Sequence, residues 1–443
     1  MVGAGLAGLA AARRLHERGA RVTLLERGER LGGRAGHEDR DGWSLDSGAH
    51  AVGSGDAALL RFAEDCGARE LLPLRPMVLG QVHRGEVIAI DPGRWRGVAR
   101  LPGMRPLDAL RLLRLDRIFA RFDAILDPAS PERGERLDDR SLADFARLYF
   151  GASVLERWAG PLVGSTCQAD EAETSRLLFL LLLRQRRWAT TGTFRAGLGR
   201  LAEAAAAPLD VRLGMPAEAV EPRPGGGLAV AANLAGEGAC SLEADAVVVA
   251  TRAGAARRLA APLLAPAEAD VLAGASYTAA VVLHAVVDRP FVDVATRVRL
   301  PHAEGWPLET LHFEPVDPVS GEAVVSLVAT DGWSRPRIDA PDESLVKELL
   351  GVLDRLQPGA SGHVRKAWLR RHREAWPRLP VGRFRALARL RRVQEDRRAA
   401  GLRLYLAGDH LGLPTLDGAV VSGERAAEDA ARDLGLSPGG APR

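Results

Sequence analysis

Apolar residues change their spacing several times along this chain, and each change marks a predicted element. Residues 6–18 repeat Leu and Ala at helical spacing and precede Gly19, so they predict a helix. Residues 20–26 are short, apolar and partly β-branched, which predicts a buried strand. Only Met1 and Val2 precede the first glycine, so we expect either an upstream start or a shortened first strand in this βαβ unit.

The middle of the chain follows a helical pattern, and strand patterns return after it. Residues 94–185 predict an inserted helical lobe. Beyond a segment of short strands over 211–250, broken by a Pro- and Gly-rich turn at 222–227, more strands predict a second, mixed sheet. The predicted helices cover residues 106–126, 141–150 and 153–162, and the later strands cover 279–287, 322–329, 363–369 and 402–407.

One predicted helix carries apolar and basic residues on separate faces. The apolar residues recur every three or four positions, so they form one stripe that fits packing into the core of a substrate lobe. A basic amphipathic helix can also lie on an anionic membrane surface, and we keep this peripheral contact as the alternative. The stripe consists of Leu112, Leu115, Phe119, Phe122 and Leu126, and the basic residues are Arg111, Arg114, Arg117 and Arg121.

Length and composition favour an ordinary globular protein of two lobes. The 443 residues exceed one typical domain, with 47% hydrophobic and 26% charged residues. A dispersed net charge of +3 argues against a nucleic-acid partner. Cys66, Cys167 and Cys240 lack metal-ligand spacing, so we expect no metal site and a reducing cytoplasm. The longest apolar run, 177–183, is too short to span a bilayer.

The first glycines form a G-x-G-x-x-G turn at the start of the first predicted helix. Gly3, Gly5 and Gly8 permit a tight turn, a close approach of pyrophosphate and close packing of helix on strand, and Leu6 and Ala7 lie between them. Glu26 ends the next strand 23 residues after Gly3, where a carboxylate accepts hydrogen bonds from ribose hydroxyls. The alternative, a chance glycine-rich helix start, is disfavoured by the βαβ context.

The residues after Glu26 extend this pattern. Arg27, the run Gly32-Gly33-Arg34 and the segment LDSGAH at 45–50 resemble the start of the superfamily of flavin amine oxidases, protoporphyrinogen oxidases and phytoene desaturases. The resemblance implies an FAD cofactor. It also implies that Gly32, Gly33 and Arg34 lie against the pyrophosphate, and that Gly48, Ala49 and His50 pass close to the flavin.

The resemblance continues to the end of the chain. It places Val220 in a strand that meets the adenine, and Gly408 and Asp409 near the ribityl chain and pyrophosphate. Asp417, Gly418 and Ala419 then start a helix whose N-terminal N–H groups face the flavin.

The resemblance implies an α/β fold with a discontinuous Rossmann-like FAD-binding domain. We expect this domain over residues 1–80, 200–265 and 385–443, and a substrate-binding lobe of mixed sheet and helices over 81–199 and 266–384.

Three kinds of substrate are open within the superfamily: amines, porphyrinogens and isoprenoids. Pro414, Thr415 and Leu416 stand where amine oxidases carry an aromatic residue, so simple amine oxidation is disfavoured. Residues 194–201 resemble a segment of protoporphyrinogen oxidases, with Ala196 in place of the first of two glycines. We therefore expect an apolar substrate, of porphyrinogen or isoprenoid and carotenoid type.

The expected reaction transfers a hydride from this substrate to flavin N5, and oxygen or a quinone-like acceptor reoxidises the cofactor. His50 and His410 are weak candidates for proton transfer, since satisfying backbone groups is the simpler role for each. The alternatives are an amine oxidase-type activity, a non-catalytic flavin-binding relative in a biosynthetic complex, and an NAD-dependent enzyme. The oligomeric state stays open.

Overall fold

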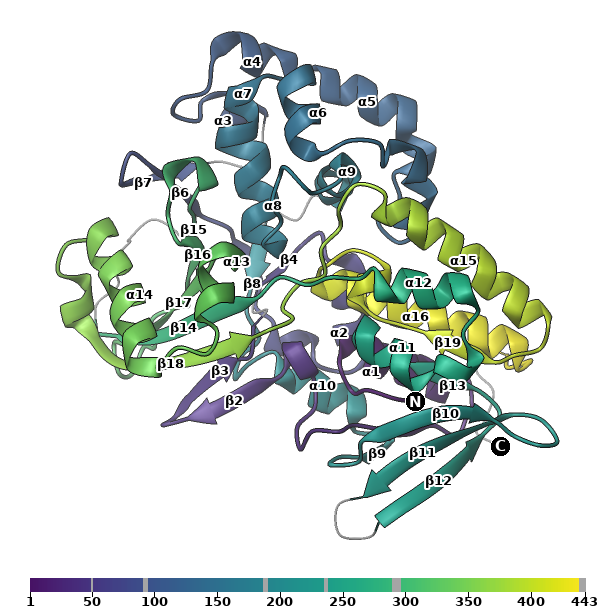
Figure 1. Ribbon diagram of the computed structural model, residues 1–443. Coiled ribbons are helices and arrows are strands. Elements are labelled where there is room, and N and C mark those ends of the chain that lie inside the picture. Colours follow the sequence, from purple (N-terminus) through teal and green to yellow (C-terminus); the bar gives the residue numbers. More distant parts are fainter. Residues whose placement is uncertain (49–50, 91–94, 186–189, 235–237, 289–295, 438–443) are drawn as a thin grey trace.

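The computed structural model describes residues 1–48, 51–90, 95–185, 190–234, 238–288 and 296–437, and it has a mixed α/β fold (Figure 1). The helices are α1 (Leu6–Glu17), α2 (Ala57–Asp65), α3 (Trp95–Ala99), α4 (Pro106–Arg111), α5 (Arg114–Phe122), α6 (Leu142–Tyr149), α7 (Ala152–Val154), α8 (Gly160–Cys167), α9 (Arg176–Gln185), α10 (Gly199–Ala206), α11 (Ala253–Leu259), α12 (Pro266–Ala273), α13 (Asp331–Ser334), α14 (Asp342–Leu356), α15 (Arg383–Ala399) and α16 (Leu416–Asp433). The strands are β1 (Thr23–Leu25), β2 (His37–Arg40), β3 (Trp43–Asp46), β4 (Val52–Gly53), β5 (Arg75–Pro76), β6 (Leu79–His83), β7 (Glu86–Ile90), β8 (Thr190–Gly192), β9 (Asp210–Arg212), β10 (Ala217–Pro222), β11 (Leu228–Leu234), β12 (Gly238–Ala244), β13 (Val247–Val249), β14 (Ala280–Val287), β15 (Arg297–Arg299), β16 (Leu308–Phe313), β17 (Ala323–Ala329), β18 (Val364–His372) and β19 (Leu404–Leu406).

A parallel sheet joins segments from both ends of the chain. Strand β1 pairs with β9, and β13 pairs with β19. Val2 bridges the two pairs, because it makes parallel bridges to Leu25 and to Val249. Val2 therefore occupies the position of the first strand, between β1 and β13, and the arrangement is that of a βαβ unit with its helix α1 behind the sheet.

The first and last helices pack closely on this sheet. A Cβ added to Gly423 of α16 would lie 2.1 Å from the carbonyl oxygen of Ala7 in α1, so only glycine allows the observed approach. Alanines on both helices, among them Ala10, Ala427 and Ala430, are buried at the contact. Small side chains therefore bring the two ends of the chain together.

The second body is built on a seven-stranded sheet in the order β18-β14-β17-β16-β15-β6-β7. Its strands are antiparallel except for the pair β15 and β6. Leu345, Leu349 and Leu353 of α14 are buried in the apolar core on one face. The other face carries polar residues in register across three strands, since Arg297 lies opposite His312, which lies opposite Ser326.

Helices α3 to α9 form the lobe at the top of Figure 1. The prediction of one helix over residues 106–126 is wrong, because the segment divides into α4, α5 and a short 3₁₀ turn. Between α4 and α5 the backbone makes i to i+3 hydrogen bonds, including one from Leu115 N to Leu112 O of 2.9 Å. Such a turn aligns residues three apart. It places Leu112 and Leu115 together in the lobe core, which confirms core packing for this part of the stripe.

The later strand predictions are confirmed as β14, β17, β18 and β19, and the turn at 222–227 joins β10 to β11. Where the domain boundaries lie stays a prediction. Within the described residues, no helix has both the length and the apolar composition that crossing a membrane requires.

Candidate functional site

A groove of about 640 Å³ runs between the parallel sheet and the end of the seven-stranded sheet. It is lined by the turn before α1, the loop after β1, the loops after β13 and β19, the start of α16 and the residues after β18. Thirteen of the predicted cofactor residues line it: Gly3, Gly5, Leu6, Ala7, Glu26, Arg27, Gly32, Gly33, Arg34, Gly48, Gly408, Asp409 and Ala419.

The three glycines of the first turn have different surroundings. Gly3 has φ +100°, and a Cβ there would lie 2.8 Å from Ala250 O. A Cβ on Gly8 would lie 1.9 Å from Gly3 O. A Cβ on Gly5 would meet only Gly32 O, at 4.0 Å, while Gly5 itself lines the groove. Gly3 and Gly8 are thus required by the fold, and Gly5 leaves open space where a ligand can approach the start of α1.

Glu26 holds two loops at the end of β1. One carboxylate oxygen accepts a hydrogen bond of 2.8 Å from Ala4 N, and the other accepts one of 2.9 Å from Gly28 N. A carboxylate has about four acceptor positions, so Glu26 keeps capacity for two more donors such as ribose hydroxyls. Its position in the groove wall therefore fits the ribose of a dinucleotide.

Arg34 and Asp409 form a bidentate ion pair across the groove. Arg34 Nη2 lies 2.8 Å from Asp409 Oδ1, and Nη1 lies 2.9 Å from Oδ2. Burial on its own would lower the pKa of Arg34, but the Asp409 carboxylate outweighs that effect and the pKa is raised. The pair fixes the loop after β1 to the loop after β19, although the two residues are 375 positions apart.

Helix α16 begins at the groove. The Thr415 side chain accepts a hydrogen bond of 3.0 Å from Gly418 N and so caps the helix. Asp417 points away from the groove, because its carboxylate accepts hydrogen bonds from Leu59 N and from Gln185 Nε2. A Cβ on Gly418 would lie 2.2 Å from Leu413 O. Asp417 and Gly418 shape the helix start, and Ala419 faces the groove.

Other predicted residues lie near the groove but do not line it. Gly8 packs beneath the turn, and Val220 is buried in the core of the β10 region. Residues 216–218 line the groove at that end in place of Val220. Ala49 and His50 lie outside the described residues.

The imidazole of His410 lies beside Gly408 in the protein interior. Its exposed fraction is 1%, and burial lowers its pKa to about 4, so the ring is neutral. His410 is absent from the groove lining. Its proposed part in proton transfer stays a prediction.

Some groove residues carry no motif that sequence could have revealed. His372, the last residue of β18, and Glu374, two residues later, enter the groove from the second body. His372 Nε2 hydrogen-bonds Ser47 O next to Gly48, and burial lowers the pKa of this imidazole. Glu374 Oε2 accepts a hydrogen bond of 2.8 Å from Arg252.

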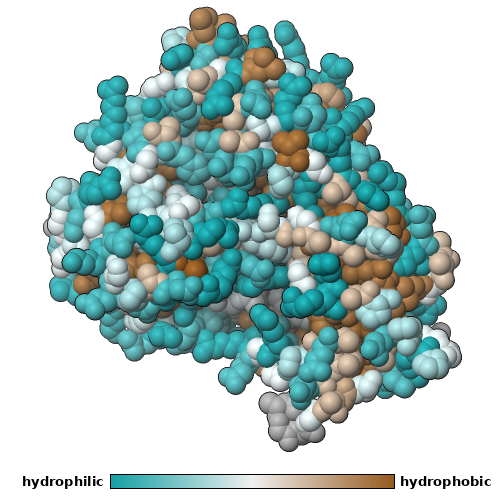
Figure 2. Space-filling view, in the orientation of Figure 1, coloured by the Kyte–Doolittle hydropathy of each residue, from teal (hydrophilic) through white to brown (hydrophobic). Residues whose placement is uncertain are grey.

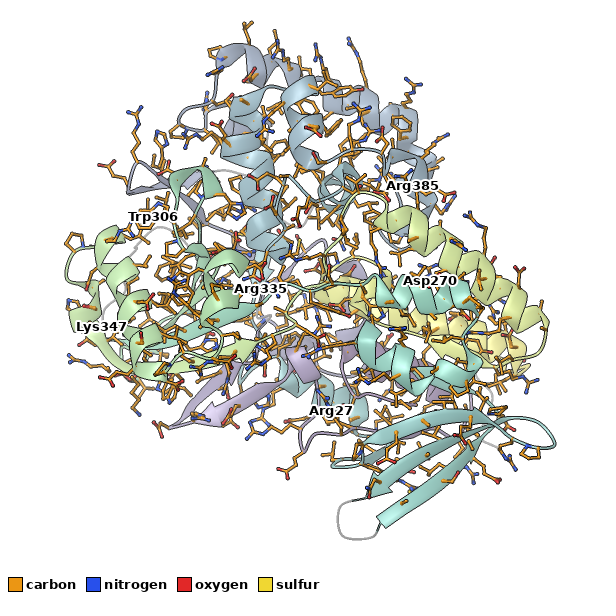
Figure 3. The ribbon with its side chains drawn as sticks, in the orientation of Figure 1. Arg27, Asp270, Trp306, Arg335, Lys347 and Arg385 are labelled. Atoms are coloured by element: carbon orange, nitrogen blue, oxygen red, sulfur yellow. The ribbon has the colours of Figure 1, made fainter. Side chains whose placement is uncertain are left out.

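A small chamber of about 70 Å³ adjoins the groove and shares Gly48, Trp376 and residues 414–416 with it. Its other walls include several polar residues: Ser165, Thr166, Gln168, Arg297, Glu309, Thr310 and His312. A second cavity of about 710 Å³ shares Gln168 and Glu309 with the chamber. Figure 3 labels Trp306 and Arg335 of this cavity on the side of the seven-stranded sheet, and Arg27 of the groove below them.

An ion-paired histidine stands where the chamber meets the second cavity. His302 Nδ1 lies 2.9 Å from Glu171 Oε2, and His302 Nε2 lies 2.9 Å from Glu309 Oε1. Burial on its own would lower the pKa of His302, but the hydrogen bonds to Glu171 and Glu309 raise it to about 11. The imidazolium thus offsets one carboxylate charge in the chamber wall.

The chain is similar to known flavoproteins along most of its length. The family model described as "Flavin containing amine oxidoreductase" matches residues 6–431. Protoporphyrinogen oxidase 2 of Arabidopsis thaliana is 27% identical over 38% of the chain, and the carotenoid phi-ring synthase of Streptomyces griseus is 31% identical over 58%. The matched segments span 32% and 53% of these relatives' own lengths.

The fold is that of solved amine oxidases. Cyclohexylamine oxidase from Brevibacterium oxydans superposes with a TM-score of 0.72 at 18% identity, covering 98% of each chain. The open space at Gly5, the acceptor capacity of Glu26 and the start of α16 all fit a flavin dinucleotide in the groove.

Proposed function

The chain belongs to the flavin containing amine oxidoreductases and is an FAD-dependent oxidoreductase, and from this premise we propose that it oxidises a porphyrinogen-type substrate. Such a substrate has an apolar macrocycle and carboxylate side chains. When bound, FAD supplies the acceptor for a hydride. Oxygen or a quinone-like acceptor then completes the turnover.

We assign the cofactor to the groove. Gly5 and the first N–H groups of α1 would receive the pyrophosphate, and Glu26 would accept the ribose hydroxyls. Arg34 and Asp409 would hold the middle of the dinucleotide, and the start of α16 would face the flavin. These assignments rest on the position of each residue in the groove wall.

The lining of the chamber beside the groove is the observation that carries the choice of substrate. Val328, Trp376 and Leu416 offer apolar surface, whereas Arg297 brings a guanidinium into the same small space. Arg297 Nε donates to Thr310 Oγ1 at 3.3 Å, and the guanidinium also hydrogen-bonds Ser165 O, so its position is held from two sides. A wall of this kind suits an apolar substrate with an anionic substituent, because the anion can pair with the guanidinium. A pure hydrocarbon would bury the charged guanidinium against apolar surface, which is unfavourable.

The protein's own residues would orient this substrate and keep water away from the reacting carbon. The chamber is narrow and the adjoining cavity is wide, so a macrocycle could lie in the cavity with one edge in the chamber. Hydride removal from such a carbon depends mainly on this orientation, and no base is assigned.

An isoprenoid or carotenoid substrate is the second candidate, since the carotenoid phi-ring synthase match covers 58% of the chain. An amine substrate is a third, given the amine oxidase fold, but Pro414, Thr415 and Leu416 place no aromatic side chain at the start of α16. A flavin-binding protein without catalysis is the remaining alternative.

The test is anaerobic mixing of the FAD-loaded protein with protoporphyrinogen, coproporphyrinogen, a squalene-type isoprenoid and an amine. We expect loss of flavin absorbance with a porphyrinogen only. Bleaching by the isoprenoid or the amine alone would assign the protein to that class, and no bleaching by any of them would favour the non-catalytic alternative.

A variant separates the carboxylate contact from a general effect on the fold. Methyl esters of the porphyrinogen remove its charge, so wild-type protein should bind the ester more weakly than the acid. Arg297→Gln should bind acid and ester alike, with unchanged flavin content. If the wild type and Arg297→Gln preferred the acid over the ester to the same extent, Arg297 would not contact the substrate carboxylate.

A further inference from the structure

The outer tip of the helical lobe exposes leucines to solvent. Leu107 and Leu110 of α4 have exposed fractions of 71% and 64%, and Leu113, just before α5, has 60%. Leu148 near the end of α6 is 66% exposed. Figure 2 shows brown side chains at the top of the view, where Figure 1 places α4 and α5.

These four leucines, here named the leucine tip, belong to one surface. Leu107, Leu110 and Leu113 follow one another at intervals of three, so they lie on successive turns opposite the buried Asp108, Leu112 and Leu115. Arg114 Nη1 donates a hydrogen bond of 2.6 Å to Tyr149 O, which ties the start of α5 to the end of α6 beside Leu148. The tip is distinct from the apolar stripe of the same segment, whose Leu112, Leu115 and Leu126 are buried.

Exposed arginines surround the leucine tip. Three exposed aspartates, Asp116, Asp123 and Asp144, lie in the same segments, and Asp123 pairs with Arg184 at 2.6 Å. Basic side chains therefore outnumber acidic ones on this surface. The exposed basic residues of residues 105–123 and 141–149 are Arg105, Arg111, Arg114, Arg117, Arg121 and Arg147.

We propose that the leucine tip inserts into the headgroup region of an anionic phospholipid bilayer. Exposed leucines that project from a short helix can enter the acyl boundary, and the arginines around them match the negative charge of phosphate headgroups. A second copy of the chain would fit this surface poorly. An isologous contact would bring six arginines against the same six arginines of the other copy.

The inference goes beyond the proposed reaction, because contact with a bilayer requires neither the flavin nor the substrate. Contact with the bilayer would also bring the protein close to an apolar substrate dissolved in the membrane.

The test is cosedimentation of the full-length protein with vesicles of equal parts phosphatidylglycerol and phosphatidylcholine, and with vesicles of phosphatidylcholine alone. We expect binding to the anionic vesicles that weakens as salt is raised. The variant Leu107→Ser/Leu110→Ser should lose binding by a factor on the order of ten for each leucine. Its matched control is Val319→Ser, because Val319 is 95% exposed in the turn between β16 and β17.

The charge contribution is measured separately. Arg117→Gln should weaken binding to anionic vesicles by about fivefold and leave binding to neutral vesicles unchanged. Arg21→Gln, exposed just before β1, is its control. Circular dichroism and flavin content would verify that every variant is folded.

Two outcomes would overturn the proposal. In one, the wild-type protein does not bind anionic vesicles, or the Leu107→Ser/Leu110→Ser variant binds them as strongly as the wild-type protein does. In the other, light scattering finds a dimer that the leucine substitutions convert to a monomer, which would make the tip a contact between copies.

Discussion

Replacement of Gly5 by alanine separates cofactor binding from folding. Gly5 has φ −73° and ψ 173°, which alanine adopts without strain, and the new Cβ would meet only Gly32 O at 4.0 Å. The apoprotein should therefore keep its stability or gain about 0.4–1 kcal/mol from the reduced freedom of its unfolded chain. The methyl group would, however, occupy the space in which the groove receives the pyrophosphate.

The loss of affinity follows from this overlap. An extra methyl group in a filled space costs about 1–3 kcal/mol. That cost corresponds to an FAD Kd about 5- to 150-fold higher. The assay is titration of the apoprotein with FAD by flavin fluorescence, together with urea unfolding of the apoprotein.

The matched control is Gly8→Ala, whose Cβ would lie 1.9 Å from Gly3 O. This variant should lose stability even without FAD, because backbone atoms cannot make room. If Gly5→Ala bound FAD as tightly as the wild type, the pyrophosphate would not pass over Gly5 and the placement of the cofactor at this turn would be refuted.

Three other variants test further features. Ala196 has φ +57°, so Ala196→Gly should raise the free energy of unfolding by about 0.5–1 kcal/mol in urea, whereas an unchanged value would argue against strain at this residue. Asp409→Ala removes the two hydrogen bonds to Arg34 and should lower the free energy of unfolding by about 1–3 kcal/mol and weaken FAD binding; retention of both properties would exclude the ion pair from the site. His302 has its pKa raised to about 11 in the folded protein from an ordinary value of 6.5, so the stability it contributes is complete below pH 6.5 and is lost as pH rises toward 11. The destabilisation caused by His302→Gln should therefore be largest below pH 6.5 and shrink at alkaline pH, and a pH-independent difference in urea unfolding would contradict the ion pair.

The groove residues that sequence could predict are those whose role is local. A glycine turn, an acidic residue at a strand end and a helix start each depend on a few neighbouring residues, so Gly3, Gly5 and Glu26 lie where their motifs put them. Ala196 illustrates the same point. The resemblance of residues 194–201 to a segment with glycine at this position implies an unusual backbone there, and the backbone of Ala196 is left-handed.

Local sequence patterns do not predict the residues that reach the groove through the packing of distant segments. His372 and Glu374 reach the groove only because the seven-stranded sheet docks beside the parallel one, and no local pattern encodes that contact. Contact of the Val220 strand with the adenine stays a prediction. Val220 points into the core, while residues 216–218 pass the groove, next to an irregularity in the pairing of β10 with β11.

The break between α4 and α5 was missed for a related reason. Helical periodicity continues through Leu112 and Leu113, and the tight turn there serves the burial of Leu112 and Leu115 in the lobe. A pattern of period 3.6 does not distinguish one long helix from two helices in near register.

The pairing of α1 with α16 sets the order of events when the protein is made. On the ribosome, α1 is synthesised long before Gly423 and the rest of α16. Until α16 has been synthesised, the alanine-rich side of α1 lacks its packing partner and the groove lacks Asp409 and Ala419. The complete FAD groove can therefore form only after α16 has been synthesised.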